Sequence, residues 1–202
     1  MSTITATITA STAASTTAEN LAGGPLPGLT PGAWVIDAGH SNVTFVARHL
    51  MIAKVRGRFG TFTGTVTVAE DVLLSSVAAT VETASITTGD EGRDAHLRNA
   101  DFFDVEQFPT MTLVSTGIEA DGSDFVLCAD LTIKGVTKSV AFELEFEGVA
   151  TDPWGNTKAG FSASTEINRK DFGLEWNLAL ETGGVVVGEK IKIQLDIEAL
   201  RS

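Results

Sequence analysis

The feature that most constrains this chain is an alternation of apolar and polar side chains, with a period of two residues, which recurs from Trp34 onward. Within residues 140–147 and again within 190–198, large apolar side chains occupy every second position, and charged or polar ones fill most of the others. Successive side chains of a strand point to opposite faces, so this pattern predicts strands with one buried face and one wet face. Turn-forming residues separate the runs, which favours an all-β antiparallel barrel or sandwich of about eight strands.

The stretch from about residue 89 to 108 breaks this period and is the most densely charged part of the chain. Its apolar residues recur at helical spacing, and Asp90 or Asp94 can cap a first helical turn. We therefore predict a short helical insert at residues 89–108 that lies across the mouth of a barrel. Its apolar anchors are Leu97, Phe102, Phe103 and Phe108.

Residues 1–32 differ in composition from the rest of the chain, since Thr, Ala and Ser dominate them and they end in a Gly- and Pro-rich linker. Such a segment buries too little apolar surface to offset the entropy of ordering it. We predict a disordered or loosely ordered N-terminal arm at 1–32, followed by one barrel domain at 33–202. The arm lacks the basic and apolar regions of a secretory signal, so we expect a cytoplasmic protein.

The formal net charge of −12 argues against a nucleic-acid partner, because phosphate contacts require patches of Lys and Arg. The basic residues are scattered along the sequence, apart from the short group Lys54, Arg56 and Arg58. No run approaches the roughly 18 consecutive apolar residues of a membrane helix, so no integral membrane segment is expected. A single cysteine, Cys128, excludes an internal disulfide.

Motifs of common enzymes and metal sites are absent from the sequence, which has no nucleophile elbow, no HExxH and no phosphate-binding loop. The three histidines, His40, His49 and His96, are therefore predicted to be structural, and no metal or cofactor is expected. Gly57 and Gly60 are predicted to frame a turn.

A polar cluster in the insert contains Arg93, Asp94, His96 and Arg98. Two roles for it stay open. These side chains either rim a cavity and contact the polar head of a ligand, or they tie the insert to the barrel by hydrogen bonds. Asp94 and His96 could also serve an enzyme as an acid–base pair.

Six motifs in a fixed order cover the chain from Trp34 to about Leu200. They are W-V-I-D-A-G-H-S-N-V-T-F from Trp34, R-G-R-F from Arg56, R-D-A-H-L-R-N-A-D-F-F-D from Arg93, F-P-T-M-T-L-V-S from Phe108, L-T-I-K-G-V-T-K from Leu131 and I-N-R-K-D-F-G from Ile167. The ordered set resembles the YceI-like family of lipocalin-like, polyisoprenoid-binding proteins. The resemblance implies an eight-stranded antiparallel lipocalin-like barrel with a helical insert, a long apolar tunnel and, as in many members, a homodimer. Many members carry a secretory signal, from which this N-terminal arm departs.

The resemblance further implies that the barrel binds an isoprenoid-type lipid, either a polyprenyl chain or an isoprenoid quinone, for storage, transport or presentation, and that the chain is not an enzyme. The predicted wall consists of Phe45, Phe62, Leu113, Leu127, Phe142, Leu144, Phe146, Phe161, Trp176 and Ile193. The predicted contacts to the polar head are Arg93, His96 and Arg169. Two alternatives stay open: an enzyme that acts on a lipid-like substrate through Asp94 and His96, and a structural or stress-associated protein whose barrel is filled by side chains.

Overall fold

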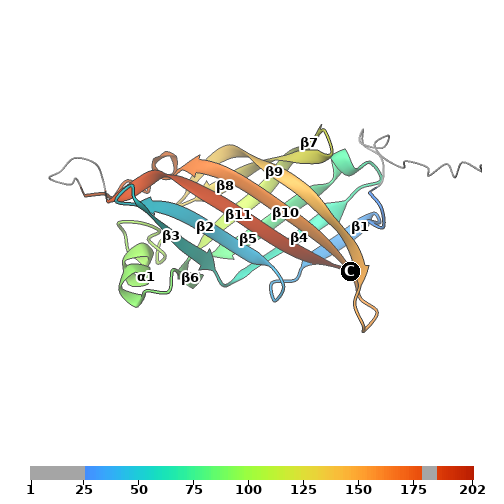
Figure 1. The fold of residues 1–202 in the computed structure, drawn as a ribbon, viewed down its shortest axis with the longest axis horizontal. Coiled ribbons are helices and arrows are strands. Elements are labelled where there is room, and N and C mark those ends of the chain that lie inside the picture. The colour runs from blue at the N-terminus through green and yellow to red at the C-terminus, as the bar shows by residue number, and fades with distance from the viewer. Residues whose placement is uncertain (1–25, 179–185) are drawn as a thin grey trace, which may run out of the picture.

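The structure is a computed structural model that describes residues 26–178 and 186–202, so residues 1–25 of the predicted arm lie outside the described residues. The described chain is almost entirely β-structure (Figure 1). The strands are β1 (Gly32–Ile36), β2 (Asn42–His49), β3 (Ala53–Phe59), β4 (Phe62–Val68), β5 (Ser76–Glu82), β6 (Ile86–Thr87), β7 (Thr110–Asp121), β8 (Asp124–Ile133), β9 (Val136–Thr151), β10 (Thr157–Asn168) and β11 (Val187–Arg201). The helices are α1 (Glu91–Arg98) and the 3₁₀ turns η1 (Val72–Leu74), η2 (Thr83–Ser85) and η3 (Arg169–Phe172).

The strands close into a barrel in the order β1-β4-β5-β7-β8-β9-β10-β11, because β11 pairs back with β1. Every pairing is antiparallel. The segments β2, β3 and β6 continue the rows of β1, β4 and β5 beyond breaks at 37–41, 60–61 and 83–85. The predicted eight-stranded antiparallel barrel is therefore confirmed.

The alternation of side chains follows the barrel wall except at three register shifts. In β7 a shift between Ser115 and Gly117 changes which positions face the interior. Met111 faces inward before the shift and Ile118 after it, although an odd number of residues separates them. A similar shift opposite Gly160 and Phe161 skips Glu147 of β9, whereas the shift in β11 between Val187 and Ile191 spans two residues and leaves both of them facing inward. A bulge inserts one residue into a strand and so reverses which positions face the core.

Packing is concentrated at the two ends of the barrel, with α1 at one end and the start of β1 at the other (Figure 1). The buried cluster at the α1 end contains Phe59, Ile86, Phe102, Met111, Leu131, Ile133, Ile167, Phe172 and Leu174. The buried cluster at the β1 end contains Leu29, Trp34, Val68, Ala159 and Ala199. The middle of the barrel is thus bounded by two packed ends.

The helical insert forms as predicted. Asp90 is the N-cap of α1, and its Oδ1 accepts a hydrogen bond from the backbone N–H of Arg93 at 2.8 Å. Arg98 fastens the end of the helix to the barrel, since its Nε donates to the Ala84 carbonyl at 2.8 Å and its Nη2 to the Ile86 carbonyl at 2.6 Å. The insert is held at the α1 end of the barrel by these bonds and by the buried ring of Phe102.

The predicted turn includes Gly60, between β3 and β4, but its boundary at Gly57 is wrong, because Gly57 lies inside β3, opposite Phe45 of β2. A Cβ on Gly57 would lie 2.3 Å from Cζ of Phe45. Glycine at this position lets the aromatic ring lie over the neighbouring strand, so its role is close packing within a strand.

The last residues before β1 pack against the barrel. Leu29 is buried and Leu26 packs against the same cluster. The indole Nε1 of Trp34 donates to the Thr30 carbonyl at 3.0 Å, which ties the segment to β1.

Candidate functional site

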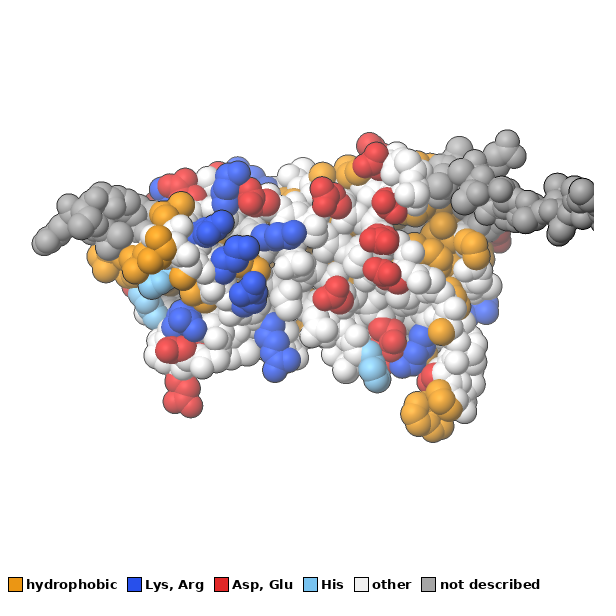
Figure 2. Space-filling model, in the orientation of Figure 1, with side chains coloured by type: hydrophobic (Ala, Val, Ile, Leu, Met, Phe, Trp, Pro, Cys, Tyr) orange, Lys and Arg blue, Asp and Glu red, His pale blue; other side chains and the backbone are white. Residues whose placement is uncertain are grey.

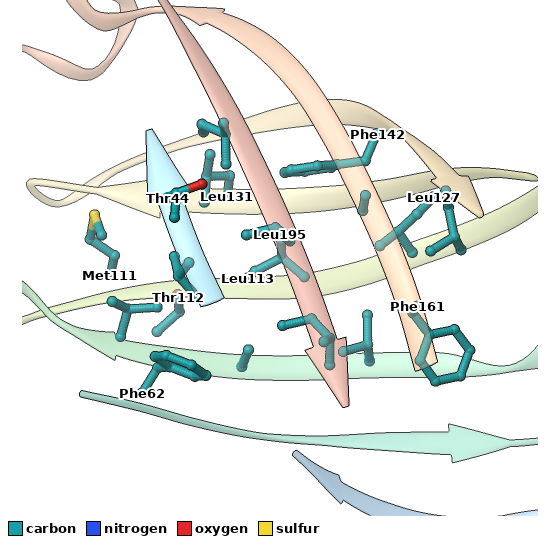
Figure 3. Close-up of a pocket in the computed structure, with 18 of the residues that line it drawn as sticks. Thr44, Phe62, Met111, Thr112, Leu113, Leu127, Leu131, Phe142, Phe161 and Leu195 are labelled. Atoms are coloured by element: carbon teal, nitrogen blue, oxygen red, sulfur yellow. The ribbon is translucent and has the colours of Figure 1, made fainter. Parts of the chain in front are cut away.

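The barrel encloses a cavity of about 280 Å³ that runs between the two packed ends. Its wall is apolar except for Thr44, Ser75, Ser76, Thr112 and Arg169. Figure 3 shows side chains from opposite strands of the barrel projecting into this space, among them those of Phe62, Leu127 and Phe142. The described interior is therefore not filled by side chains, in contrast to the alternative of a filled barrel.

Nine of the ten predicted apolar wall residues line this cavity, because they occupy inward positions of regular strands. They are Phe45, Phe62, Leu113, Leu127, Phe142, Leu144, Phe146, Phe161 and Ile193. Trp176 does not line it. The ring of Trp176 packs against His96 and Phe102, with centroid distances of 4.6 and 5.3 Å, in an irregular segment where no alternation indicates which way a side chain points.

Both ends of the cavity are formed by residues that strand periodicity does not identify as wall. At the α1 end these are Leu97, Phe102 and Phe103, which the sequence indicated only as anchors of the insert. At the other end they are Leu26 and Leu29, which precede β1. Their apolar character in otherwise polar or Pro-rich surroundings is the signal that could have identified them.

The polar residues of the insert face the barrel wall rather than the cavity. Asp94 is 6% exposed and accepts hydrogen bonds from Thr87 Oγ1 at 2.9 Å, Thr88 N at 2.8 Å and Thr88 Oγ1 at 2.6 Å. The Nε of Arg93 donates to Thr88 Oγ1 at 2.7 Å. Both side chains thus tie the insert to the barrel, and Arg93 does not line the cavity.

Burial acts on the pKa of Asp94 in the opposite direction to its hydrogen bonds. Desolvation raises the pKa, whereas the bonds from Thr88 and Thr87, with the nearby charge of Arg98, lower it further than burial raises it. The carboxyl is therefore a stabilised anion near neutral pH and not a proton donor.

His96 also lies outside the cavity. Its Nε2 is 2.9 Å from Asp101 Oδ2, and its ring packs edge-on against Phe102 at 5.1 Å. Asp94 bonds the threonines on the other side of the helix turn, so the acid–base pair predicted for Asp94 and His96 is not assembled.

Arg169 is the one charged side chain of the cavity wall among the described residues. It is 3% exposed; its Nε donates to the Gly188 carbonyl at 3.1 Å and its Nη1 to the Leu174 carbonyl. Its Nη2 has no hydrogen-bond acceptor among the described residues. Burial lowers the pKa of the guanidinium and the nearby Glu189 opposes this, but an arginine still keeps its charge in a protein. Arg169 therefore places positive charge at the α1 end of an apolar cavity.

A second polar cluster lies on the outer surface near the β1 end. Asp37, His40 and Glu198 approach one another closely enough to hold a cation. Lys158 Nζ already bonds both carboxylates, at 3.2 Å to Asp37 and 2.6 Å to Glu198. The cluster is thus an ion-pair network in which Lys158 already holds both carboxylates.

An apolar cavity of this size is costly for a protein that does not use it. At about 24 cal/mol per Å³, leaving 280 Å³ unpacked costs about 7 kcal/mol. That is comparable to the whole stability of a typical domain, about 5–15 kcal/mol. The cavity is therefore the feature of this fold that most requires a functional explanation.

Among the described residues, no helix has both the length and the apolar character needed to cross a membrane.

Solved structures share this barrel. The crystal structure of BcnA from Burkholderia cenocepacia aligns with a TM-score of 0.69 and 24% identity, covering 81% of this chain and 98% of that one. A YceI protein from Campylobacter jejuni aligns with a TM-score of 0.66 and 29% identity, covering 77% and 90%. A structure from Saccharophagus degradans, described as a polyisoprenoid binding domain, aligns with a TM-score of 0.64 and 16% identity, covering 86% and 100%.

Sequence similarity agrees with the fold. A UPF0312 protein of Staphylococcus aureus strain MSSA476 is 36% identical over 167 residues, which is 82% of this chain and 95% of that protein. A UPF0312 protein of strain N315 is 35% identical over the same length. Residues 34–199 match the family model described as YceI-like domain, and the chain therefore belongs to the YceI-like family.

Proposed function

We propose that this protein binds a long apolar lipid of the isoprenoid type, a polyprenyl chain or an isoprenoid quinone, inside the barrel, and stores, transports or presents it. The observation that supports the proposal is the apolar cavity of about 280 Å³. An isoprenoid chain has no polar group that must be satisfied, and each Å² of its surface removed from water contributes about 25 cal/mol.

The shape of the cavity favours an extended ligand over a compact one. Its wall includes Leu29 at one end of the barrel and Leu97 at the other. Strand β11 has 15 residues and spans roughly 45 Å at about 3.3 Å per residue. A space that extends between the two ends along such strands accommodates a linear chain better than a planar or globular cofactor. The Saccharophagus degradans structure described as a polyisoprenoid binding domain has the same fold.

The proposed contact for the polar head of the ligand is Arg169. Its Nη2, which has no acceptor among the described residues, belongs to a side chain of the cavity wall, whereas Arg93 and His96 lie outside the cavity. A carbonyl or phosphate oxygen is an acceptor that a guanidinium binds well. The ligand would thus lie with its head near η3 and its chain toward β1.

Organic extraction of the purified protein tests the proposal. Mass spectrometry of the extract should reveal a polyprenyl chain or an isoprenoid quinone in an amount close to that of the protein. Protein stripped of lipid should take up a long-chain quinone again. An extract without lipid, together with no uptake of long-chain quinones or polyprenols, would contradict the proposal.

The predicted homodimer and the cytoplasmic localisation stay predictions. Light scattering of the purified protein tests the first, and fractionation of the native cells tests the second.

A further inference from the structure

Five of the 14 basic residues, on three neighbouring strands, gather on one face of the folded barrel. Lys54, Arg56 and Arg58 are exposed at alternate positions of β3. Arg48, exposed on the neighbouring strand β2, pairs directly with Lys54. Figure 2 shows Lys and Arg side chains together on one half of this face, with Asp and Glu side chains predominating on the other half.

The group extends across a third strand. Lys192 of β11 lies opposite Val46 of β2, which in turn lies opposite Arg56 of β3. Cations on β11 and β3 therefore flank the apolar Val46 in one row. We call the set Arg48, Lys54, Arg56, Arg58 and Lys192 the basic face.

The cations of the basic face lack ion-pair partners among the described residues. Over residues 26–178 and 186–202, none of its five cations forms an ion pair, whereas the adjacent Lys190 is paired with Glu166 at 2.7 Å. Like charges directly opposite each other in a sheet, such as Arg48 and Lys54, are destabilising. Glu166 of β10 lies opposite Lys192, but its carboxylate forms its ion pair with Lys190. An anionic partner would remove this repulsion.

An apolar tip adjoins the basic face at the turn between β2 and β3. Met51 is 56% exposed and Ile52 is 83% exposed. Leu178, 57% exposed, lies beside this turn, because Val186 accepts a hydrogen bond from Leu50 N at 2.9 Å and donates one to the Leu178 carbonyl at 3.1 Å. Three large apolar side chains are therefore presented to solvent next to unpaired cations.

The turn holds this tip in a conformation that bulky residues rarely adopt. Leu50 and Met51 have φ values of +51° and +61°. Positive φ costs a non-glycine residue of order 1 kcal/mol or more and persists at sites where the surroundings impose it. The strain and the exposure of the apolar side chains are two independent signs of a role for the tip outside the packing of the barrel.

The tip lies next to the end of the cavity. Ala47 of β2 and Val187 of β11 line the cavity, and Val187 pairs with His49, which directly precedes the turn. Arg169 lies at the same end, bonded to the Gly188 carbonyl. The basic face and the tip are thus placed at the same end of the barrel as Arg169.

We infer that the basic face and the apolar tip dock this protein on an anionic lipid bilayer, with the cations on lipid head groups and Met51 and Ile52 inserted among them. Lipid binding alone does not require docking, so this inference goes beyond the proposed function. Exposed apolar side chains beside the cations favour a bilayer over a nucleic acid, since phosphodiester backbones offer no apolar layer for them.

The acidic character of the whole chain does not oppose this orientation. At about 0.1 M salt, charges separated by more than about 10 Å are largely screened. Strand β11 spans roughly 45 Å, so carboxylates toward the β1 end act weakly at a membrane that touches the tip. Docking should therefore be strongest at moderate salt and weaken at high salt.

Flotation with lipid vesicles tests the inference. Vesicles of phosphatidylcholine containing a third phosphatidylglycerol should bind the wild-type protein at about 0.1 M salt, and vesicles of phosphatidylcholine alone should not. The variant Lys54→Gln/Arg56→Gln should bind the anionic vesicles about 25-fold more weakly, because each cation near such a surface contributes about a factor of five. The variant Ile52→Ser should bind roughly tenfold more weakly.

Two control variants match these changes outside the docking surface. Lys138→Gln/Arg201→Gln removes two exposed cations on β9 and at the far end of β11, and should change binding less than about twofold. Leu74→Ser removes a side chain that is 75% exposed in η1, and should leave vesicle binding unchanged. Circular dichroism and thermal unfolding establish that each variant keeps the fold.

The inference would be overturned by equal binding to neutral and anionic vesicles, by no binding to either, or by equal losses in the docking and control variants. If the protein binds duplex DNA or RNA more tightly than anionic vesicles, and Lys54→Gln/Arg56→Gln weakens that binding, the basic face would be assigned to nucleic acid instead. Lipid content is measured separately on the same preparations. A protein that carries lipid but does not dock refutes only this inference, whereas one that docks without carrying lipid refutes only the proposed function.

Discussion

Asp94 shows how one buried carboxylate can position a whole segment. It receives three hydrogen bonds from Thr87 and Thr88, at the junction between β6 and α1. The pKa of Asp94 lies below its ordinary value of about 3.8, because these bonds outweigh the effect of burial. The sequence suggested this tie for Asp94, but it left open a role in catalysis that the direction of the hydrogen bonds now argues against.

The substitution Asp94→Asn should lower the free energy of unfolding near neutral pH by about 1–3 kcal/mol, because the amide can accept fewer of these bonds. Because the folded-state pKa is depressed, the stabilisation is complete above the unfolded-state pKa and is lost as the pH falls through the folded-state value. Urea unfolding as a function of pH should therefore show the two proteins converging in acid. The control Asp90→Asn retains an N-cap and should be nearly neutral; equal effects of both changes would contradict this account.

Gly57 is required for packing between β2 and β3. The substitution Gly57→Ala would place a Cβ 2.3 Å from Cζ of Phe45, and should destabilise the fold by about 1–3 kcal/mol through overpacking. Gly117 is a matched control in β7, since a Cβ there meets nothing within 4 Å. Thermal unfolding should separate the two variants, and a melting temperature for Gly57→Ala no lower than that for Gly117→Ala would refute the packing role.

At the scale of elements, α1 and the turns that follow it close one end of the cavity. Leu97 and Phe103 line that end, and the ring of Phe103 packs edge-on against Phe59 of β3 at 5.7 Å. The insert contacts the barrel through hydrogen bonds to η2, β6 and the residues that follow β6, and through the apolar side chains of Leu97, Phe102 and Phe103, but not through a β-ladder. A segment held in this way can open without unfolding the barrel.

The substitution Arg98→Ala should loosen this closure, because it removes the bonds to the Ala84 and Ile86 carbonyls. We expect faster amide hydrogen exchange over 91–98, faster release of bound lipid and little change in exchange within β8 and β9. Arg201→Ala, which removes an exposed arginine at the end of β11, is the control. Unchanged exchange in α1 would show that the bonds of Arg98 do not hold the insert.

The elements also show what could be predicted from the sequence. The alternation in β9 and β11 indicates both the strands and their inward faces, which is why nine of the ten residues named from the sequence line the cavity. The bulge at Ser115 could not be predicted, because it depends on pairing with a distant strand. The side chain of Trp176 follows no period, and its position is decided by contacts with the insert.

At the scale of the molecule, closure of the barrel creates both the cavity and the distribution of charge. Strand count and family resemblance predicted the closure, in which β11 pairs back with β1. The basic face could not be predicted, because Arg48, Arg56 and Lys192 meet only when β2, β3 and β11 pair. Residues far apart in sequence thus form the basic face, whereas the inward positions of the cavity wall follow from the local alternation within each strand.

The central claim is that the barrel interior holds the lipid chain, and a cavity-filling variant tests it most directly. Ala163 of β10 lines the cavity, whereas Ala141 of β9 is exposed outside the barrel. Titration of lipid-free protein with a long-chain isoprenoid quinone should show binding at least tenfold weaker for Ala163→Phe than for wild type, about 1.4 kcal/mol, with Ala141→Phe unchanged. Equal affinity in all three proteins, with folding intact, would contradict the claim.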